Sequence, residues 1–218
     1  MRTLALFLVM SLLCARSFAQ QDSASQHTSP QPAPATSSLP QDSHDGMTLS
    51  ADPYTDPARA KEKFGKANPI PAGILPVEVF LRNDTAQPIH IDLSTVQLDI
   101  HSNSAGNQEV DWLGVYEVAR AIAHPGGAPA PGLPRFPIGV RRGTDSKIDD
   151  LANILRPLAL DADIVPPLGM IHGFLFFDMN HRMTLVENSS LYLPDAAIVP
   201  SNKPLMFFEV PLGDAPEP

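Results

Sequence analysis

Alternating apolar and polar residues predict most of the folded part of this chain as β-strands. Val77, Val79 and Leu81 fall on one face of a strand over 76–82, because successive side chains of a strand point to opposite sides. The same alternation recurs in several later segments. The full set of predicted strands covers 76–82, 89–93, 96–100, 170–178, 191–193, 197–199 and 205–210.

Two of these segments differ in character. The strands at 89–93 and 96–100 have polar residues on one face, which is typical of an antiparallel sheet with one side in water. The strand at 170–178 is apolar on both faces, with Phe174 and Phe176 on one and Leu175 and Phe177 on the other. We therefore expect it to lie centrally in the core.

Three segments have helical rather than strand periodicity. A short helix over 57–63 would begin with Pro57 at its first position. Residues 107–123 and 146–156 place their apolar side chains at helical spacing, and a Pro/Gly-rich stretch separates them. Strands on both sides of a helical middle predict a mainly β fold, an antiparallel sandwich with a helical insertion at roughly 107–157, in a single domain over 52–213 whose inserted part spans 105–160.

The start of the chain reads as a targeting segment. Arg2, the apolar run over 4–13 and the small residues Ser17 and Ala19 form a secretory signal peptide over 1–19, too short to span a bilayer. An alternative is lipid anchoring at Cys14, although bulky Leu13 stands where a small residue is expected. The signal peptide places the protein outside the cytoplasm, in the periplasm or the extracellular space.

Residues 20–51 are rich in Gln, Ser, Pro, Ala and Thr and contain no aromatic residue. We expect a disordered linker, because such a composition buries too little apolar surface to offset the loss of chain entropy. It is either a spacer or an unselected leader. Residues 214–218 are expected to form a flexible tail.

Several of these strands carry a family resemblance. The run Val77–Thr85, followed by Pro88–Ile91, resembles the early hairpin of immunoglobulin-like domains in exported bacterial proteins, and 173–177 and 205–210 are similar to later strands of such domains. The chain departs from antibody-type domains in its long insertion and in the absence of their two cysteines. The resemblance implies an immunoglobulin-like sandwich; domains of this kind are mostly adhesive or scaffolding, and no catalytic residue is carried over.

Composition excludes several classes. The 24 prolines among 218 residues argue against a helical bundle. A formal charge of −9 argues against a nucleic-acid partner. The single cysteine excludes an internal disulfide and a zinc ribbon, and loss of residues 1–19 removes it altogether.

Catalytic and metal-binding motifs are not apparent in the sequence. The histidines form no His-Glu-x-x-His pair, and no nucleophile elbow or phosphate loop occurs, so no metal, cofactor or catalytic residue is assigned. His90 and His101 would approach each other only if their strands pair. The carboxylates Glu78, Glu209, Asp92 and Asp99 are candidates for hydrolysis by residue type alone.

Two features are candidate binding residues. Arg135, Arg141, Arg142 and Lys147 form a cationic group in an otherwise acidic chain, suited to carboxylate or phosphate ligands unless nearby acids pair with them. His172 shares a strand face with Phe174 and Phe176, where it is either a site residue or a hydrogen-bonded histidine of the core or its rim. The expected function is a non-enzymatic interaction or scaffolding module of the bacterial cell envelope that binds another envelope protein or a surface polymer. The alternative is an envelope hydrolase or carbohydrate-active protein that uses carboxylates on the sheet.

Overall fold

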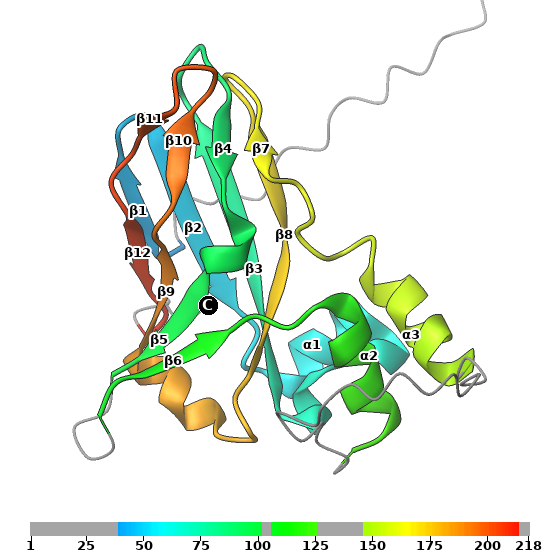
Figure 1. Cartoon of the computed structure of the whole chain (residues 1–218). Helices are drawn as coiled ribbons and strands as arrows, with labels where there is room; N and C mark the ends of the chain where they lie inside the picture. Colours follow the sequence, from blue (N-terminus) through cyan, green and yellow to red (C-terminus); the bar gives the residue numbers. More distant parts are fainter. Residues whose placement is uncertain (1–38, 102–105, 126–145, 214–218) are drawn as a thin grey trace, which may run out of the picture. The chain divides into compact units, whose positions relative to one another are not determined.

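The computed structural model describes residues 39–101, 106–125 and 146–213, which form three four-stranded antiparallel sheets and several short helices (Figure 1). Sheet A has the strand order β1 (Gln41–His44), β2 (Met47–Pro53), β3 (Ile74–Asn83) and β8 (Met170–Asp178). Sheet B has the order β11 (Lys203–Pro204), β10 (Ala196–Ile198), β4 (Ile89–Ile91) and β7 (Ile164–Val165). Sheet C has the order β12 (Phe208–Pro211), β9 (Ser189–Leu193), β5 (Gln97–Ile100) and β6 (Gln108–Asp111).

Three short connections in the chain link a strand of sheet B directly to a strand of sheet C. The short 3₁₀ helix η4 (Leu93–Thr95) joins β4 to β5, Pro194 and Asp195 join β9 to β10, and β11 leads into β12. Asp92 begins η4 by accepting a 2.9 Å hydrogen bond from the amide of Ser94. The three neighbouring strands β11, β10 and β4 of sheet B are thus each joined by a short break to β12, β9 and β5 of sheet C. Further 3₁₀ turns are η2 (Gly65–Ala67), η3 (Ile70–Ala72) and η5 (Met183–Asn188).

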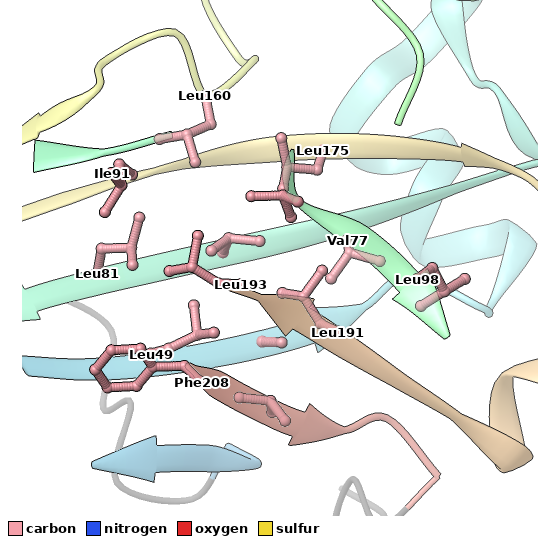
Figure 2. Close-up of a cluster of buried hydrophobic side chains, with 14 of the residues drawn as sticks. Leu49, Val77, Leu81, Ile91, Leu98, Leu160, Leu175, Leu191, Leu193 and Phe208 are labelled. Carbon is pink, nitrogen blue, oxygen red and sulfur yellow. The ribbon is translucent and has the colours of Figure 1, made fainter. Parts of the chain in front are cut away.

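One apolar core takes side chains from all three sheets. Figure 2 shows Leu81 of sheet A, Ile91 of sheet B and Leu191 of sheet C pointing into this core, and all three are buried. The inward faces predicted from alternation in 76–82, 89–93 and 96–100 are confirmed. The predicted richness in antiparallel strands is confirmed as well, within a mixed structure that also has a few short helices, whereas the immunoglobulin-like sandwich stays a prediction.

A second core lies on the other face of sheet A. The helices α1 (Pro57–Phe64), α2 (Val115–Ala123) and α3 (Ser146–Leu155) cover this face, and Phe64 packs edge-on against Phe174 of β8. This explains why β8 is apolar on both sides: one side faces the sheet core and the other faces the helices.

The expectation that 170–178 lies centrally in the core is confirmed by burial on both faces, although β8 is the last strand of sheet A. The edge of β8 that does not pair with β3 forms isolated β-bridges with Trp112 and Ala159. Gly173 makes room for the latter segment, since a Cβ at this position would lie 2.6 Å from backbone atoms of Leu160. The strand is buried by helices and loops rather than by a further strand.

The predicted helices are confirmed at two of three positions. α1 begins with Pro57, and Asp56 accepts hydrogen bonds from the amides of Ala58 and Arg59. α3 also matches its predicted range. The helix predicted over 107–123 is wrong in its first part, because 108–111 pairs with β5 as strand β6 and α2 begins only at Val115.

The linker predicted to run to residue 51 ends earlier, because β1 and β2 form a hairpin over 41–53. Asp45 and Gly46 have φ of 52° and 81°, as a two-residue type I′ turn requires. Met47, Leu49 and Ala51 alternate into the core, so this segment buries apolar surface despite its polar composition. Residues 20–38 of the predicted linker, the signal peptide and the tail at 214–218 lie outside the described residues.

Candidate functional site

Glu78 is a nearly buried carboxylate on the helix-covered face of sheet A. Strand pairing places it directly between Asp52 of β2 and Phe174 of β8. Its side chain is only 10% exposed. A carboxylate in such a place requires partners, because an unpaired buried charge is strongly destabilising.

Three side chains from different elements supply those partners. The hydroxyl of Tyr54 donates to Oε2 of Glu78 over 3.0 Å. Lys63 Nζ, from α1, lies 3.5 Å from Oε1, and His172 Nδ1, from β8, lies 3.7 Å from the same oxygen. Both carboxylate oxygens are therefore engaged, and the cluster joins α1 to sheet A.

A second ion pair borders this cluster. Arg59 donates through Nη1 to Oδ1 of Asp52 over 2.8 Å and through Nη2 to the other oxygen. Its guanidinium carbon also lies 3.8 Å from the centre of the Tyr54 ring. The hydrogen bond to Asp52 raises the pKa of Arg59, so the cation is retained at any physiological pH.

The chemistry of Tyr54 follows from these surroundings. Burial, and then the negative charge of Glu78, raise the pKa of Tyr54 to about 12. The phenol is therefore a stable hydrogen-bond donor and not a base. The cluster of Tyr54, Lys63, Glu78 and His172 is a closed set of mutually paired groups.

His172 is the predicted site residue that the structure places in this cluster. Its side chain is 56% exposed and its ring stacks on Phe80, with centroids 5.6 Å apart and an interplanar angle of 13°. It is a rim histidine beside a buried acid. Tyr54 and Lys63 were missed as partners, although both stand in the basic, aromatic segment that follows β2.

The cationic candidates do not form a described site. Lys147 donates from Nζ to the backbone carbonyl of Ala123 over 3.0 Å, at the C-terminal end of α2, where a cation is favourable. Arg135, Arg141 and Arg142 lie outside the described residues. The other candidate histidines do not meet through their strands, because β4 pairs with β10 and β7 whereas β5 pairs with β9 and β6.

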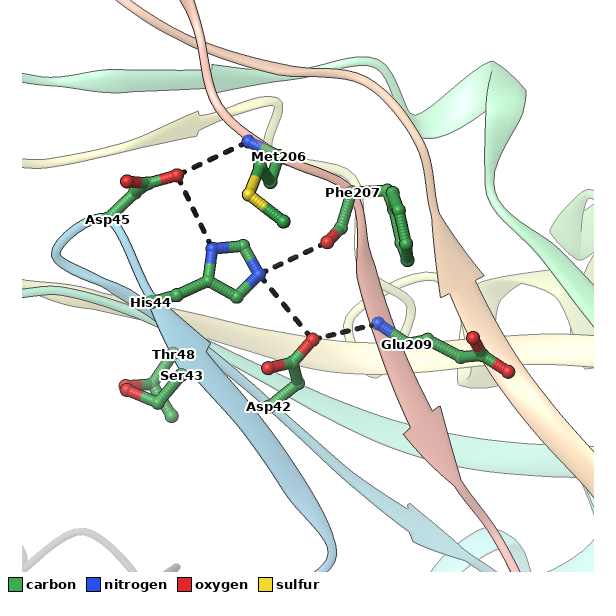
Figure 3. A network of polar contacts seen from close by, with 8 residues as sticks. All are labelled: Asp42, Ser43, His44, Asp45, Thr48, Met206, Phe207 and Glu209. Atoms are coloured by element: carbon green, nitrogen blue, oxygen red, sulfur yellow. Dashed lines mark hydrogen bonds and ion pairs between the residues drawn. The ribbon is translucent and has the colours of Figure 1, made fainter.

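A second polar network closes the edge between β1 and β12 (Figure 3). Asp45 accepts from the amide of Met206 over 3.3 Å, and Asp42 accepts from the amide of Glu209 over 3.1 Å. His44 contacts the carbonyl of Phe207 through Nε2 at 3.1 Å. Side chains of β1 and of the turn after it thus satisfy backbone groups of β12 and of the two residues before it.

The solvent-facing side of sheet C combines acidic and aromatic residues. Strand register puts Asp99 directly opposite Glu109, and Glu209 opposite Tyr192, on the side away from the core. The ring of Phe207 lies 5.6 Å from that of Tyr192. Asp111 completes a group that we call the acidic–aromatic face: Asp99, Glu109, Asp111, Tyr192, Phe207 and Glu209.

Charge on the acidic–aromatic face is largely uncompensated. Nε2 of His101 lies 3.8 Å from Oε1 of Glu209. Within the described ranges, no lysine or arginine pairs with Asp99, Glu109 or Asp111. Like charges directly opposite each other on neighbouring strands are destabilising, so Asp99 and Glu109 weaken the sheet that holds them.

Known proteins provide no analogy for either region. No protein-family model, curated protein or solved structure matches the chain. In the part of the chain that the structure describes, no three His, Cys, Asp or Glu side chains are grouped to hold a metal ion. The described helices are all too short or too polar to cross a membrane.

Proposed function

We propose that this chain is an exported, non-enzymatic interaction module of the bacterial cell envelope. The observation that carries the proposal is the state of Glu78, the carboxylate that comes nearest to a catalytic one. Tyr54 and two basic side chains engage its oxygens. A general base or nucleophile needs a free oxygen that reaches substrate.

Asp52, which neighbours Glu78, is a feature of the described residues that favours the hydrolase alternative. It stands directly opposite Glu78 across β2 and β3, so two carboxylates are adjacent on the sheet. Arg59 holds Asp52 through both oxygens, however, and neither acid is left unpaired. This supports a structural role for the pair and favours a binding module over a hydrolase.

Photo-crosslinking in the native cell tests the proposal without knowledge of the partner. A photoreactive phenylalanine analogue is placed, one position at a time, at Tyr192 on sheet C, at His90 on sheet B and at Lys63 beside Glu78. We expect a discrete adduct with another protein or an envelope polymer from at least one position. Absence of an adduct at all three, together with a hydrolytic activity that Glu78→Gln abolishes, would overturn the proposal.

A further inference from the structure

We propose that the acidic–aromatic face binds a basic protein segment that also carries an apolar side chain. This inference rests on the proposed binding function and names the surface and the partner chemistry. Among the residues that the structure describes, Phe207 and its neighbour Met206 are two of the few large apolar side chains in solvent, 47% and 62% exposed. They lie where sheet C meets the edge network of β1.

The exposed ring of Phe207 and the half-buried ring of Tyr192 suggest an apolar contact. Phe207 immediately precedes β12, and its ring centroid lies 5.6 Å from that of Tyr192 on the neighbouring strand β9. Aromatic residues and methionine are enriched in the centres of protein interfaces. A pair of rings at the surface therefore offers a contact point for one apolar side chain of a partner.

The charges around the rings specify the sign of that partner. Asp99, Glu109 and Asp111 have no basic partner in the described ranges, and the chain as a whole carries a formal charge of −9. A basic segment would relieve the repulsion between Asp99 and Glu109, whereas a second copy of this acidic chain would add to it. Charge complementarity thus favours a basic partner over self-association.

A surface hollow extends the same face. It has a volume of about 220 Å³ and is lined by residues that include His101, Glu187, Ser190 and Pro211. Ser190 and Pro211 belong to the same outward row as Asp99 and Glu109. The hollow can receive a side chain of the bound segment, with Glu187 among its lining residues.

Fluorescence anisotropy with a defined probe tests this inference. The probe is a labelled short peptide of alternating lysine and leucine, and a glutamate–leucine peptide serves as its charge-reversed counterpart. We expect the purified protein to bind the lysine–leucine peptide and not the glutamate–leucine peptide. Binding should be tighter at about 50 mM than at about 500 mM salt. The double variant Asp99→Asn/Glu109→Gln should weaken binding about tenfold.

Matched variants separate this surface from general acidity. Glu62→Gln/Asp150→Asn changes the net charge equally on α1 and α3, and we expect less than about a twofold effect. Phe207→Ser should weaken binding without changing its salt dependence. Equal loss in both double variants, or no loss in Phe207→Ser, would overturn the inference.

The cell-based adducts distinguish the two proposals. A protein adduct from His90 or Lys63 but not from Tyr192 would leave the interaction module standing and contradict this surface. Salt-independent binding of a neutral oligosaccharide, with no binding of the lysine peptide, would contradict the basic protein segment as the ligand and indicate a surface polymer in its place.

Discussion

Asp99 and Glu109 stand directly opposite each other on β5 and β6, with both side chains on the solvent-facing side of sheet C. We expect Glu109→Gln to raise the free energy of unfolding by about 0.5 kcal/mol, because it removes a like-charge cross-strand pair. Urea denaturation measures the change. The gain should vanish at about 1 M salt, where the charges are screened; an equal gain at high salt would assign it to another cause.

Tyr54 and Glu78 form the central hydrogen bond of the sheet A cluster. Tyr54→Phe should lower the free energy of unfolding by about 1–2 kcal/mol, because Glu78 keeps its burial and loses a donor. Chemical denaturation gives the value. Tyr192→Phe is the control, at a half-buried position on the solvent-facing side of sheet C, and an equal loss there would mean that Glu78 does not need the Tyr54 hydroxyl.

The ionisation of Tyr54 predicts a pH dependence. Its pKa is raised to about 12 in the folded protein, against about 10 in an unfolded chain. The folded state then retains a proton that the unfolded state loses, so this contribution to stability is complete below pH 10 and disappears as pH rises towards 12. The protein should lose more stability over that range than Tyr54→Phe does, as thermal unfolding at several pH values would measure. Parallel curves for the two proteins would contradict the assignment.

Gly173 allows the segment before β7 to reach the edge of β8. Gly173→Ala should cost about 1–3 kcal/mol, because its Cβ would lie 2.6 Å from the backbone of Leu160. Gly114→Ala is the comparison, since the nearest atom to its Cβ would be the flexible Glu117 carboxylate at 3.6 Å. Thermal denaturation of both variants ranks the two costs. Equal stability would mean that the 158–160 segment moves away freely.

The edge formed by β12 and the residues just before it depends on carboxylate acceptors from β1 and the turn after it. Asp42→Ala and Asp45→Ala should speed hydrogen exchange at the amides of Glu209 and Met206 respectively, because each amide loses its carboxylate partner. Exchange at Val210, whose side chain is in the core, serves as the internal reference. Unchanged exchange at Met206 and Glu209 would show that these carboxylates do not protect the edge.

The strands with regular alternation could be predicted from the sequence, and the first hairpin could not be recognised from composition. β3, β4 and β8 were found because one-sided or two-sided burial leaves a period of two. β1 and most of β2 were assigned to a linker because residues 20–51 are rich in Gln, Ser, Pro, Ala and Thr and contain no aromatic residue. The adjacent Asp45 and Gly46 are the signal that would have located the hairpin.

The candidate sites depend on which strands pair and in what register, and no local sequence pattern contains that information. His172 and Glu78 were both named from sequence, but they meet only because β3 and β8 pair in one register. Glu109 was placed at the start of a helix, so its position opposite Asp99 was not foreseen. Long-range register and helix docking create both groups of residues, and neither leaves a local sequence period.

Crosslinking from Tyr192 in the native cell tests the central claim most directly, because it asks whether this acidic–aromatic face is in contact with a partner. We predict one discrete protein adduct from the Tyr192 position, which Asp99→Asn/Glu109→Gln in the same chain diminishes and Glu62→Gln/Asp150→Asn leaves unchanged. A Tyr192 position that yields no adduct, while Lys63 or His90 does, would contradict it.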